Sequence, residues 1–425
     1  MEKAGKRILV VGSGAREHAI AMGIRSGEND RDVIVAPGNP GMSEDVTVRS
    51  DIPEDVAEGA EWIASLEPDL VVIGPEKPLS QGLGDLLKER KIPVVGPTRE
   101  AARIESSKVF AKKRMQAAGI PTAQYQVVSN PEETRELCRI WGFPVVLKAD
   151  GLAQGKGVSV IQDPDGLEDA IERFFVKREF KEAQDLIYLE KGLSGPEASF
   201  IVLTDGKKFI PFPVARDYKR IGEDDRGPNT GGMGAVTPLD FWTDGDQSEA
   251  CHIVERCLWS LSKVGSPFVG FLYAGLMKTE EGLRVLEFNA RFGDPEAQVL
   301  IPAAGDSYCD MLMSTASGTL DTGHRMIADP RVAVVMASRG YPENPETGYF
   351  LDGLDTARQI KGARIYTAGV SIKDGRIVSS GGRVLTATGE GALLPDARRV
   401  AYEAIGKIRL EGGQYRRDIG IVNPR

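Results

Sequence analysis

The sequence predicts a multidomain protein in which a parallel α/β layer is followed by an α+β domain and a small α/β domain at the C-terminus. Its 425 residues exceed the length of one ordinary domain. Short apolar runs alternate with helix-length stretches up to about residue 105, and hairpin-like strand pairs follow. We place the boundaries near Glu105 and Ala328, which gives domains 1–105, 106–328 and 329–425.

Composition narrows the function classes. The formal net charge of −9 argues against a nucleic-acid or anionic-membrane surface. The four cysteines lack C-x-x-C spacing, and three scattered histidines do not make a zinc cluster. The apolar run at 8–11 is too short for a secretion signal or a membrane span. We therefore expect a cytoplasmic protein with small-molecule partners, no nucleic acid and no membrane, and take a monomer as the working hypothesis.

Glycine-rich loops follow three apolar runs of the N-terminal layer, at 12–14, 38–41 and 74–79. Loops after successive parallel strands gather at one sheet edge, which indicates a ligand site there. A dinucleotide fingerprint is incomplete, because Glu17 occupies the third glycine position and no ribose-binding acid follows the second run. Phosphate binding at the start of the first helix and simple tight packing of the turn remain equally open.

The run from Lys148 to Val158, KADGLAQGKGV, combines glycines with two lysines. A Walker A loop is excluded, since the spacing is short and Gly157 stands where a serine or threonine is required. The flanking strands VVLKA and VSVIQ predict a hairpin. Gly155 and Gly157 would let its tip approach phosphate oxygens, while Lys148 and Lys156 would supply charge. The alternative is an exposed flexible hairpin.

The segment LRVLEFNARFGDPE predicts a strand with chemistry on one face. Period-two alternation places Glu287, Asn289 and Arg291 on one side and Leu286 and Phe288 on the other. Carboxylate and amide oxygens suit Mg²⁺, and a guanidinium can bind a carboxylate or phosphate. A solvated face with an ion pair between neighbours is the weaker alternative.

The stretch 215–238 is polar, rich in charge and ends in GGMG. So long a connection is usually functional or disordered, and a surface linker is the plain alternative. Its charged residues Asp217, Lys219, Asp225 and Arg226 could meet both charges of an amino acid. No role is assigned to the histidines at 18, 252 and 324.

Taken in order, several segments resemble the phosphoribosylamine–glycine ligase family over nearly the whole chain. The matching segments are VVGSGAREHA, GPEKPL, ESSKVFAKKRM, LKADGLAQGKGV, GPEASF, RDYKRIGEDDRGPNTGGMGA, LEFNARFGDPEAQ and YRRDIGI. The resemblance implies a Rossmann-like N-terminal domain, an ATP-grasp domain with a mobile lid at about 124–192, and ATP held between the lid and a larger antiparallel sheet.

The resemblance also implies residue roles. ATP would be bound by Lys108, Lys148, Gly155, Lys156, Gly157, Glu190, Lys191, Leu193 and Glu197, with 190–193 as the adenine hinge. Mg²⁺ or Mn²⁺ would be held by Glu287 and Asn289. The phosphoribosyl and amine substrates would meet Gly12, Gly14, Asn39, Gly41, Gly74, Glu76, Lys219, Asn229 and Gly232, while Arg291, Asp294 and Asp217 would lie near the reacting groups.

The implied reaction joins glycine to phosphoribosylamine through glycyl phosphate, which requires no side-chain nucleophile. The sequence departs from the pattern of these enzymes at two places. The segment FLYAGLM lacks the second metal-binding carboxylate that many ATP-grasp enzymes carry there, and Ala15 stands where the family often has glycine. The rival hypotheses are another ATP-grasp carboxylate–amine ligase, a nicotinamide oxidoreductase and a nucleotide sensor without turnover.

Overall fold

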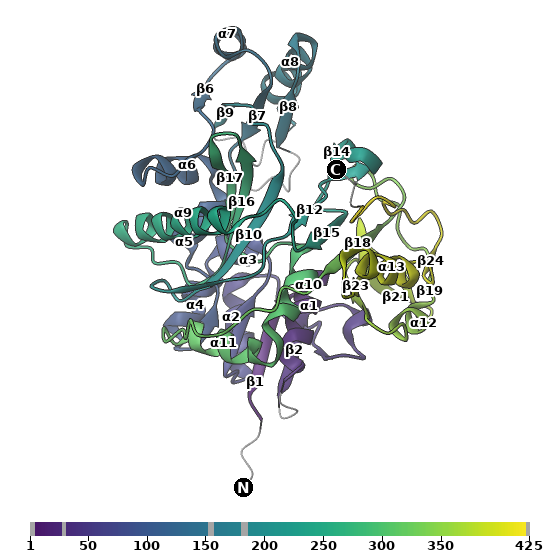
Figure 1. The fold of residues 1–425 in the computed structure, drawn as a ribbon. Coiled ribbons are helices and arrows are strands. Elements are labelled where there is room, and N and C mark those ends of the chain that lie inside the picture. The colour runs from purple at the N-terminus through teal and green to yellow at the C-terminus, as the bar shows by residue number, and fades with distance from the viewer. Residues whose placement is uncertain (1–4, 28–30, 152–156, 180–185, 422–425) are drawn as a thin grey trace.

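The structure is a computed structural model that describes residues 5–27, 31–151, 157–179 and 186–421. In Figure 1 the N-terminal α/β layer lies at the bottom, a long central sheet rises from it to a small sheet at the top, and the C-terminal domain lies to the right. Among the described residues, no helix has both the length and the apolar character needed to cross a bilayer.

The N-terminal domain is a parallel sheet, as predicted, with strand order β3-β2-β1-β4-β5. Its strands are β1 (Arg7–Gly12), β2 (Asp32–Pro37), β3 (Thr47–Val48), β4 (Leu70–Ile73) and β5 (Val94–Val95). Its helices are α1 (Ala15–Arg25), a 3-10 turn (Pro40–Met42), α2 (Val56–Ser65), α3 (Glu76–Gln81), α4 (Leu83–Glu89) and α5 (Arg99–Ser106). Because β1 lies between β2 and β4, the three glycine-rich loops open at one edge of the sheet.

The top subdomain is an antiparallel sheet in the order β6-β9-β7-β8. Its strands are β6 (Tyr125–Val128), β7 (Val145–Ala149), β8 (Val158–Ile161) and β9 (Ile187–Lys191); its helices are α7 (Pro131–Trp141), α8 (Pro164–Ile171) and a π-helical turn (Glu172–Val176). Strands β7 and β8 pair Val145 with Ile161 and Lys148 with Val158. This pairing confirms the predicted hairpin.

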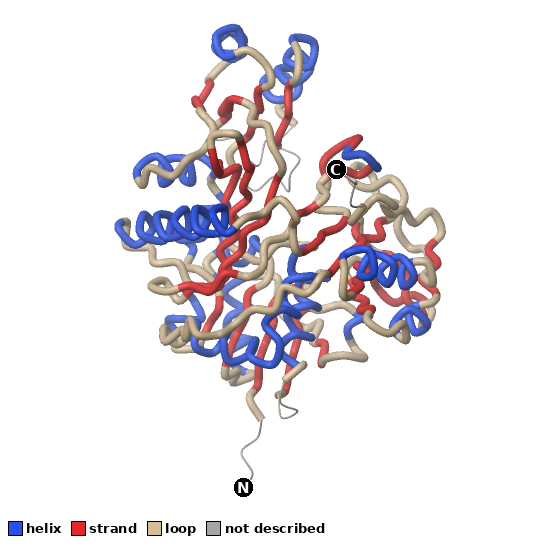
Figure 2. Tube along the Cα trace, viewed as in Figure 1, coloured by secondary structure: helices blue, strands red, loops and turns tan. Residues whose placement is uncertain are grey.

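The central sheet has the order β11-β10-β16-β17. Its strands are β10 (Glu197–Thr204), β11 (Phe209–Pro211), β16 (Gly270–Thr279) and β17 (Gly282–Asn289). Helices α6 (Lys108–Ala117) and α9 (Asp244–Lys263) pack against β17 and against each other, and Figure 2 shows both beside this sheet. The buried apolar side chains of α9 therefore close one face of the sheet.

Strand β17 departs from the predicted alternation. Its register against β16 shifts between Gly275 and Leu276, which leaves Leu286 as an extra residue in a bulge. Leu286 is consequently only partly buried, whereas Val285 and Phe288 are buried. The prediction that Leu286 and Phe288 lie on the same face of the strand is therefore wrong. The strand ends at Asn289, so Arg291 lies beyond it.

The polar stretch at 215–238 is not a linker. It forms β12 (Arg216–Asp217) and β15 (Gly234–Thr237), which join the C-terminal sheet in the order β12-β15-β18-β23-β20, and between them a hairpin of β13 (Arg220–Gly222) and β14 (Arg226–Asn229) around a 3-10 turn (Glu223–Asp225). The rest of this sheet is β18 (Arg331–Ala337), β20 (Ala363–Thr367) and β23 (Arg383–Glu390). The middle of the chain therefore completes the C-terminal domain.

The remaining elements connect or cover these sheets. They are α10 (Glu296–Leu300), a 3-10 segment (Ile301–Ser307), α11 (Tyr308–Ala316), β19 (Leu351–Asp352), α12 (Leu354–Arg358), β21 (Val370–Lys373), β22 (Arg376–Ser379), α13 (Leu394–Ile405) and β24 (Arg409–Leu410). The apolar face of α13 packs on β18 and β23, burying Ala397, Ala401 and Ile405.

A buried polar network docks the C-terminal domain onto the N-terminal one. His18 is fully buried; its Nδ1 accepts the Thr367 N–H at 3.0 Å and its Nε2 lies 2.9 Å from Asp45 Oδ2. These partners fix a neutral ring that carries its proton on Nε2. Asn39 Nδ2 donates to Thr367 O, and Thr367 Oγ1 donates to Asn39 Oδ1. A Cβ atom on Gly41 would lie 2.5 Å from Thr367 Cγ2, so glycine permits this close approach.

This network should make the domain contact acid-sensitive. Burial lowers the pKa of His18, although Asp45 opposes the shift, so the unfolded chain binds the proton more readily than the folded one. Stability from this histidine is therefore lost as the pH falls below about 6.5, the value for an exposed histidine. We expect the thermal midpoint advantage of the wild type over His18→Gln to shrink between pH 7.5 and pH 5.5, measured in matched buffers. A constant difference would contradict the assignment.

Candidate active site

The strongest charged cluster joins the top subdomain to α6. Lys148 on β7 places Nζ 2.5 Å from Glu190 Oε2 on β9, and Lys112 of α6 pairs with the other oxygen of the same carboxylate. Lys112 Nζ also donates to Thr122 Oγ1 at 2.6 Å. All three charged side chains are buried, so one carboxylate balances two ammonium groups away from water.

The protonation states in this cluster follow from the balance of burial and charge. Burial raises the pKa of Glu190, but Lys148 and Lys112 outweigh it and the net shift is downward. Burial lowers the pKa of Lys112 against the opposing effect of Glu190. Sequence reasoning did not single out Lys112. Its spacing of four residues from Lys108 on one helix was the available signal.

The start of α6 is tied to the root of the glycine–lysine hairpin. Ser107 caps α6 and donates to Asp150 Oδ2 at 3.0 Å, while Lys108 Nζ donates to the Gly151 carbonyl at 2.7 Å. Gly157 is buried, and its carbonyl accepts the Ala149 N–H. Gly155 and Lys156 lie outside the described residues. Lys108 and Lys148 thus share one side of the hairpin root.

The expected adenine hinge connects β9 to the central sheet. Lys191 ends β9 with an exposed side chain, and its N–H donates to Gln124 O. Leu193 is partly buried in the following turn, and Glu197 begins β10. The side chain of Glu190 is engaged by lysines, so a contact with adenine would have to come from the backbone.

Glu287 and Asn289 lie side by side near the end of β17. Asn289 Nδ2 is 3.5 Å from Glu287 Oε1, at the outer limit of a hydrogen bond. Within the described part of the chain, no three histidine, cysteine, aspartate or glutamate side chains gather as a self-sufficient metal site. Two hard oxygen donors at an open strand end nevertheless fit Mg²⁺, which commonly takes one or two carboxylates together with phosphate oxygens and water.

A second polar group faces β10 from the 215–238 segment. Lys219 Nζ lies 2.8 Å from Glu197 Oε2 and lowers the pKa of that carboxyl. Burial raises the pKa of Asp217 well above its usual value, and Glu296 adds to the shift. Among the described residues, Asp217 Oδ1 is buried without a hydrogen-bond partner. A Cβ atom on Gly232 would lie 2.7 Å from that oxygen, so glycine keeps the approach to Asp217 open.

Arg291 bridges the N-terminal domain and the end of the central sheet. Its Nε lies 3.2 Å from Glu76 Oε2 and its Nη2 lies 3.1 Å from Glu105 Oε1. Burial acts to lower the pKa of Arg291, but Glu105 and Glu76 outweigh it and raise the value. Glu105 also accepts the Ala290 N–H at 2.8 Å. The guanidinium is therefore held by two carboxylates from different segments.

Asp294 is fixed by the C-terminal domain. Arg383 Nη2 lies 2.9 Å from Asp294 Oδ2, and Arg383 Nη1 donates to the carbonyls of Asp294 and Gly231. Gln298 Nε2 donates to Asp294 Oδ1 at 2.8 Å. Arg383 was missed from the sequence, because nothing near it in GGRVL marks a long-range partner. It joins the Asp294 turn to the GGMG loop.

The glycine-rich loops of the N-terminal layer close around Glu17. A Cβ atom on Gly12 would lie 2.4 Å from Glu17 Cγ, and one on Gly74 would lie 2.2 Å from Glu17 Oε1. The Glu17 carboxylate accepts the Gly14 N–H at 2.7 Å and pairs with Arg16. Tight packing therefore accounts for both glycines. Substrate contact by these loops stays a prediction.

Two further predicted residues are held by the protein itself. Asn39 donates to Ser13 O and Thr367 O and accepts from Gly41 N and Thr367 Oγ1, so its amide group is fully used. Asn229 ends β14 opposite Arg220 and is partly buried.

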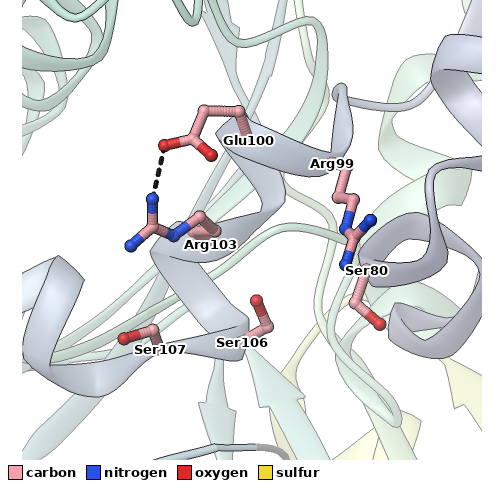
Figure 3. Close-up of a pocket in the computed structure, with 6 residues that line it drawn as sticks. All are labelled: Ser80, Arg99, Glu100, Arg103, Ser106 and Ser107. Atoms are coloured by element: carbon pink, nitrogen blue, oxygen red, sulfur yellow. Dashed lines mark hydrogen bonds and ion pairs between the residues drawn. The ribbon is translucent and has the colours of Figure 1, made fainter.

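A pocket of about 480 Å³ is lined by residues of α3 and α5 and by Ser107. Figure 3 shows its lining of Ser80, Arg99, Glu100, Arg103, Ser106 and Ser107. Arg103 is paired with Glu100 at 2.6 Å, and its guanidinium lies over Phe110. None of the predicted site residues lines it, so the candidate site is defined by the charged groups described above.

The buried carboxylate at 190 gives a stability test. Glu190→Gln would leave two buried ammonium groups without their shared anion, so we expect a loss of about 3 kcal/mol in the free energy of unfolding, measured by urea denaturation. Glu168→Gln is the matched control in the same subdomain, because Glu168 pairs with Arg135 at the surface and should matter little. Equal effects of the two changes would refute the buried-cluster account.

Comparison with known proteins assigns the family. The N, ATP-grasp (A) and C domain profiles of phosphoribosylglycinamide synthetase match residues 6–105, 106–297 and 331–422. Phosphoribosylamine–glycine ligase from Leifsonia xyli subsp. xyli is 41% identical, over 97% of this chain and 99% of that protein. The human trifunctional purine biosynthetic protein adenosine-3 is 38% identical, over 97% of this chain and 42% of its own length.

Solved structures agree. The crystal structure of phosphoribosylamine–glycine ligase from Thermotoga maritima gives a TM-score of 0.84 at 35% identity, covering 97% of this chain and 99% of that one. N5-carboxyaminoimidazole ribonucleotide synthetase from the same organism shares the fold, with a TM-score of 0.64 at 20% identity over 95% of this chain and 99% of that one. These matches confirm the resemblance and the expected fold class: the chain belongs to the phosphoribosylamine–glycine ligase family of ATP-grasp proteins.

Proposed function

We propose that this chain ligates glycine to 5-phosphoribosylamine at the expense of ATP, giving glycinamide ribonucleotide, ADP and phosphate in purine biosynthesis. The observation that carries the proposal is a buried oxygen of Asp217 that has no hydrogen-bond partner among residues 5–27, 31–151, 157–179 and 186–421. Asp217 and Lys219 lie on a segment that joins the lysine-lined ATP-grasp domain to the C-terminal domain. An amino acid brings both a cation and an anion, and this group offers a partner for each.

The reaction proceeds in two displacements. A carboxylate oxygen of glycine attacks the γ-phosphorus of ATP, the bond to the β,γ-bridging oxygen breaks, and ADP leaves. The amine nitrogen of phosphoribosylamine then attacks the carbonyl carbon of glycyl phosphate, phosphate leaves, and the nitrogen loses a proton. Positioning and charge stabilisation account for catalysis of this kind, so no side-chain nucleophile is needed.

The nucleotide would lie between the top subdomain and the central sheet. Lys108 and Lys148 would bind its phosphates, with Gly155, Lys156 and Gly157 closing over them as a lid; Glu190, Lys191 and Leu193 would meet adenine, and Glu197 the ribose. Support for this arrangement comes from the shared hairpin root of the two lysines. Closure would exclude water from a reactive acyl phosphate.

Glu287 and Asn289 would hold Mg²⁺ or Mn²⁺. A bound divalent ion supplies neutralisation of the charge that develops on the transferred phosphoryl group. The side chains of Glu287 and Asn289 contribute by presenting two hard oxygens near Lys108. Burial lowers the pKa of Lys108, and the Glu287 carboxylate only partly opposes this shift.

The amine and acid substrates would meet at the junction of the three domains. Asp217 would accept the glycine ammonium, while Arg291 and Asp294 orient the reacting groups. The phosphoribosyl end would lie along the loops of Gly12, Gly14, Asn39, Gly41, Gly74 and Glu76, with Lys219, Asn229 and Gly232 closing the other side. Support comes from the ion pairs of Arg291 with Glu76 and of Asp294 with Arg383, which bring these segments together.

The proposal includes a division of the chain into 1–105, 106–328 and 329–425, with the lid at about 124–192. The end of α5 at Ser106 and the top sheet at 125–191 support the first boundary and the lid. Strands β12 and β15 precede the boundary near residue 328 in the sequence, yet they form one sheet with β18, β23 and β20, which follow it. We further propose a cytoplasmic enzyme whose partners are its small-molecule substrates.

The activity is tested by phosphate release from ATP and Mg²⁺ with glycine, with and without freshly generated phosphoribosylamine, and by the mass of the product. Release that requires both substrates, together with the mass of glycinamide ribonucleotide, is expected. Release with a different acid or amine only would instead identify another ATP-grasp carboxylate–amine ligase.

Glu287→Ala is expected to lower kcat by at least about 10²-fold with little change in thermal stability, because it removes a partly exposed carboxylate that would hold the charge-neutralising divalent ion. Glu281→Ala is the matched control, since Glu281 is an exposed residue of the same hairpin paired with Arg284. Full activity of Glu287→Ala at ordinary Mg²⁺ would remove the metal assignment.

A further inference from the structure

The C-terminal motif YRRDIGI matches the family but has no part in the chemistry proposed above. Within it, Arg416 has a side chain that is 2% exposed, whereas the adjacent Arg417 is exposed. A buried guanidinium is costly unless all of its donors are used. Its partners therefore show what the motif does.

Each of the three guanidinium nitrogens of Arg416 donates at least one hydrogen bond. Nε and Nη2 bind the two oxygens of Asp418 at 2.8 and 2.6 Å, while Nη1 binds Asp225 Oδ1 at 2.7 Å and the Arg220 carbonyl at 3.1 Å. Asp418 belongs to the same motif, but Arg220 and Asp225 belong to the β13–β14 hairpin. The C-terminal segment is thereby bound to a hairpin almost two hundred residues earlier in the chain.

Backbone contacts reinforce this junction. The Asp224 N–H donates to Asp418 Oδ2 at 3.0 Å, and the Arg417 N–H donates to Glu223 Oε1 at 3.2 Å. Asp224 and Asp225 both have positive φ, 56° and 52°, a left-handed conformation that costs energy in residues with a side chain. The hydrogen bonds from the C-terminal segment hold this turn in place.

Arg416 also holds Tyr218. Its guanidinium lies 5.1 Å from the centre of the Tyr218 ring, and the Gly420 N–H donates to Tyr218 Oη at 3.3 Å. Tyr218 is buried in the apolar core of the C-terminal domain. Both of its backbone groups pair with one neighbouring segment, because its N–H donates to Gly234 O and its carbonyl accepts the Met233 N–H.

The residues on either side of Tyr218 are Asp217 and Lys219. In an extended, ladder-paired segment successive side chains point to opposite faces. Anchoring Tyr218 in the C-terminal core therefore directs Asp217 and Lys219 to the opposite face, where Lys219 meets Glu197 of β10. The position of both charged groups depends on how firmly the intervening tyrosine is held.

We propose that Arg416 is a positioning residue of the ligase: by fixing Tyr218 and the 220–229 hairpin, it sets the place of Asp217 and Lys219 for the amino-acid and amine substrates. The inference rests on the proposed function. It also predicts a defect that is larger for glycine than for ATP, because the nucleotide-side lysines lie on α6 and β7, outside this network, and Lys219 meets the nucleotide side through its pair with Glu197.

The test uses the full-length chain with Arg416→Lys, Arg416→Gln and the control Arg417→Gln. Lysine keeps the charge but cannot reproduce the fork. We expect Arg416→Lys to lower kcat/KM for glycine on the order of 10²-fold through misplacement of the binding groups, with a much smaller change in KM for ATP, and Arg416→Gln to be worse. Arg417→Gln should match the wild type. Parallel changes in the ATP and glycine constants, or wild-type kinetics of Arg416→Lys, would overturn the proposal.

Hydrogen exchange provides a readout independent of activity. Residues 220–229 should exchange faster in Arg416→Lys than in Arg417→Gln, while exchange in β7 and β9 stays the same. Unchanged protection of 220–229 would also overturn the proposal. If the wild type forms no glycinamide ribonucleotide, the proposed function fails by itself, and the exchange comparison still decides whether Arg416 holds the hairpin.

Discussion

Charged side chains that are buried where two segments of the chain meet need an oppositely charged partner on the other segment. This requirement determines how several parts of the molecule pack together. Glu190 draws Lys148 and Lys112 together from a strand and a helix. Arg291 is held by carboxylates of the N-terminal domain, and Arg383 of the C-terminal domain holds Asp294. Since an unpaired buried charge costs far more than a surface one, the pairs of Lys112, Arg291 and Arg383 each fix the relative position of two segments that are distant in the sequence.

Buried polar groups need partners as well, so residues predicted to bind substrate also take part in the contacts between domains. Asn39 and Gly41 lie in a loop at the ligand edge of the parallel sheet, yet their immediate partner is Thr367 of the C-terminal domain. Glu17 fills the space left by Gly12 and Gly74. The loops that would meet the phosphoribosyl group are thus held by Glu17 of their own domain and by Thr367 of the C-terminal domain, which keeps their backbone in place.

The sequence was informative where periodicity is local. Apolar runs alternating with helices predicted the parallel sheet, and the strands VVLKA and VSVIQ predicted the hairpin that carries the glycines and lysines. Prediction from the sequence failed where a single extra residue or a partner far along the chain determines the local structure. The bulge at Leu286 shifts the alternation without any mark in the sequence, and β12 and β15 join the C-terminal sheet through β18, which lies almost a hundred residues further along the chain. Lys112, Arg383 and Arg416 gain their roles from partners far along the chain.

The C-terminal sheet draws β12 and β15 from the middle of the chain, and this has a consequence for synthesis. Strand β15 leaves the ribosome almost a hundred residues before its neighbour β18, so its edge stays unpaired until Arg331–Ala337 has emerged. An exposed strand edge is a template for wrong pairing with other chains. A chain that stalls or is cut between these strands would therefore be prone to aggregate, and a C-terminal fragment expressed alone would begin with an open edge at β18.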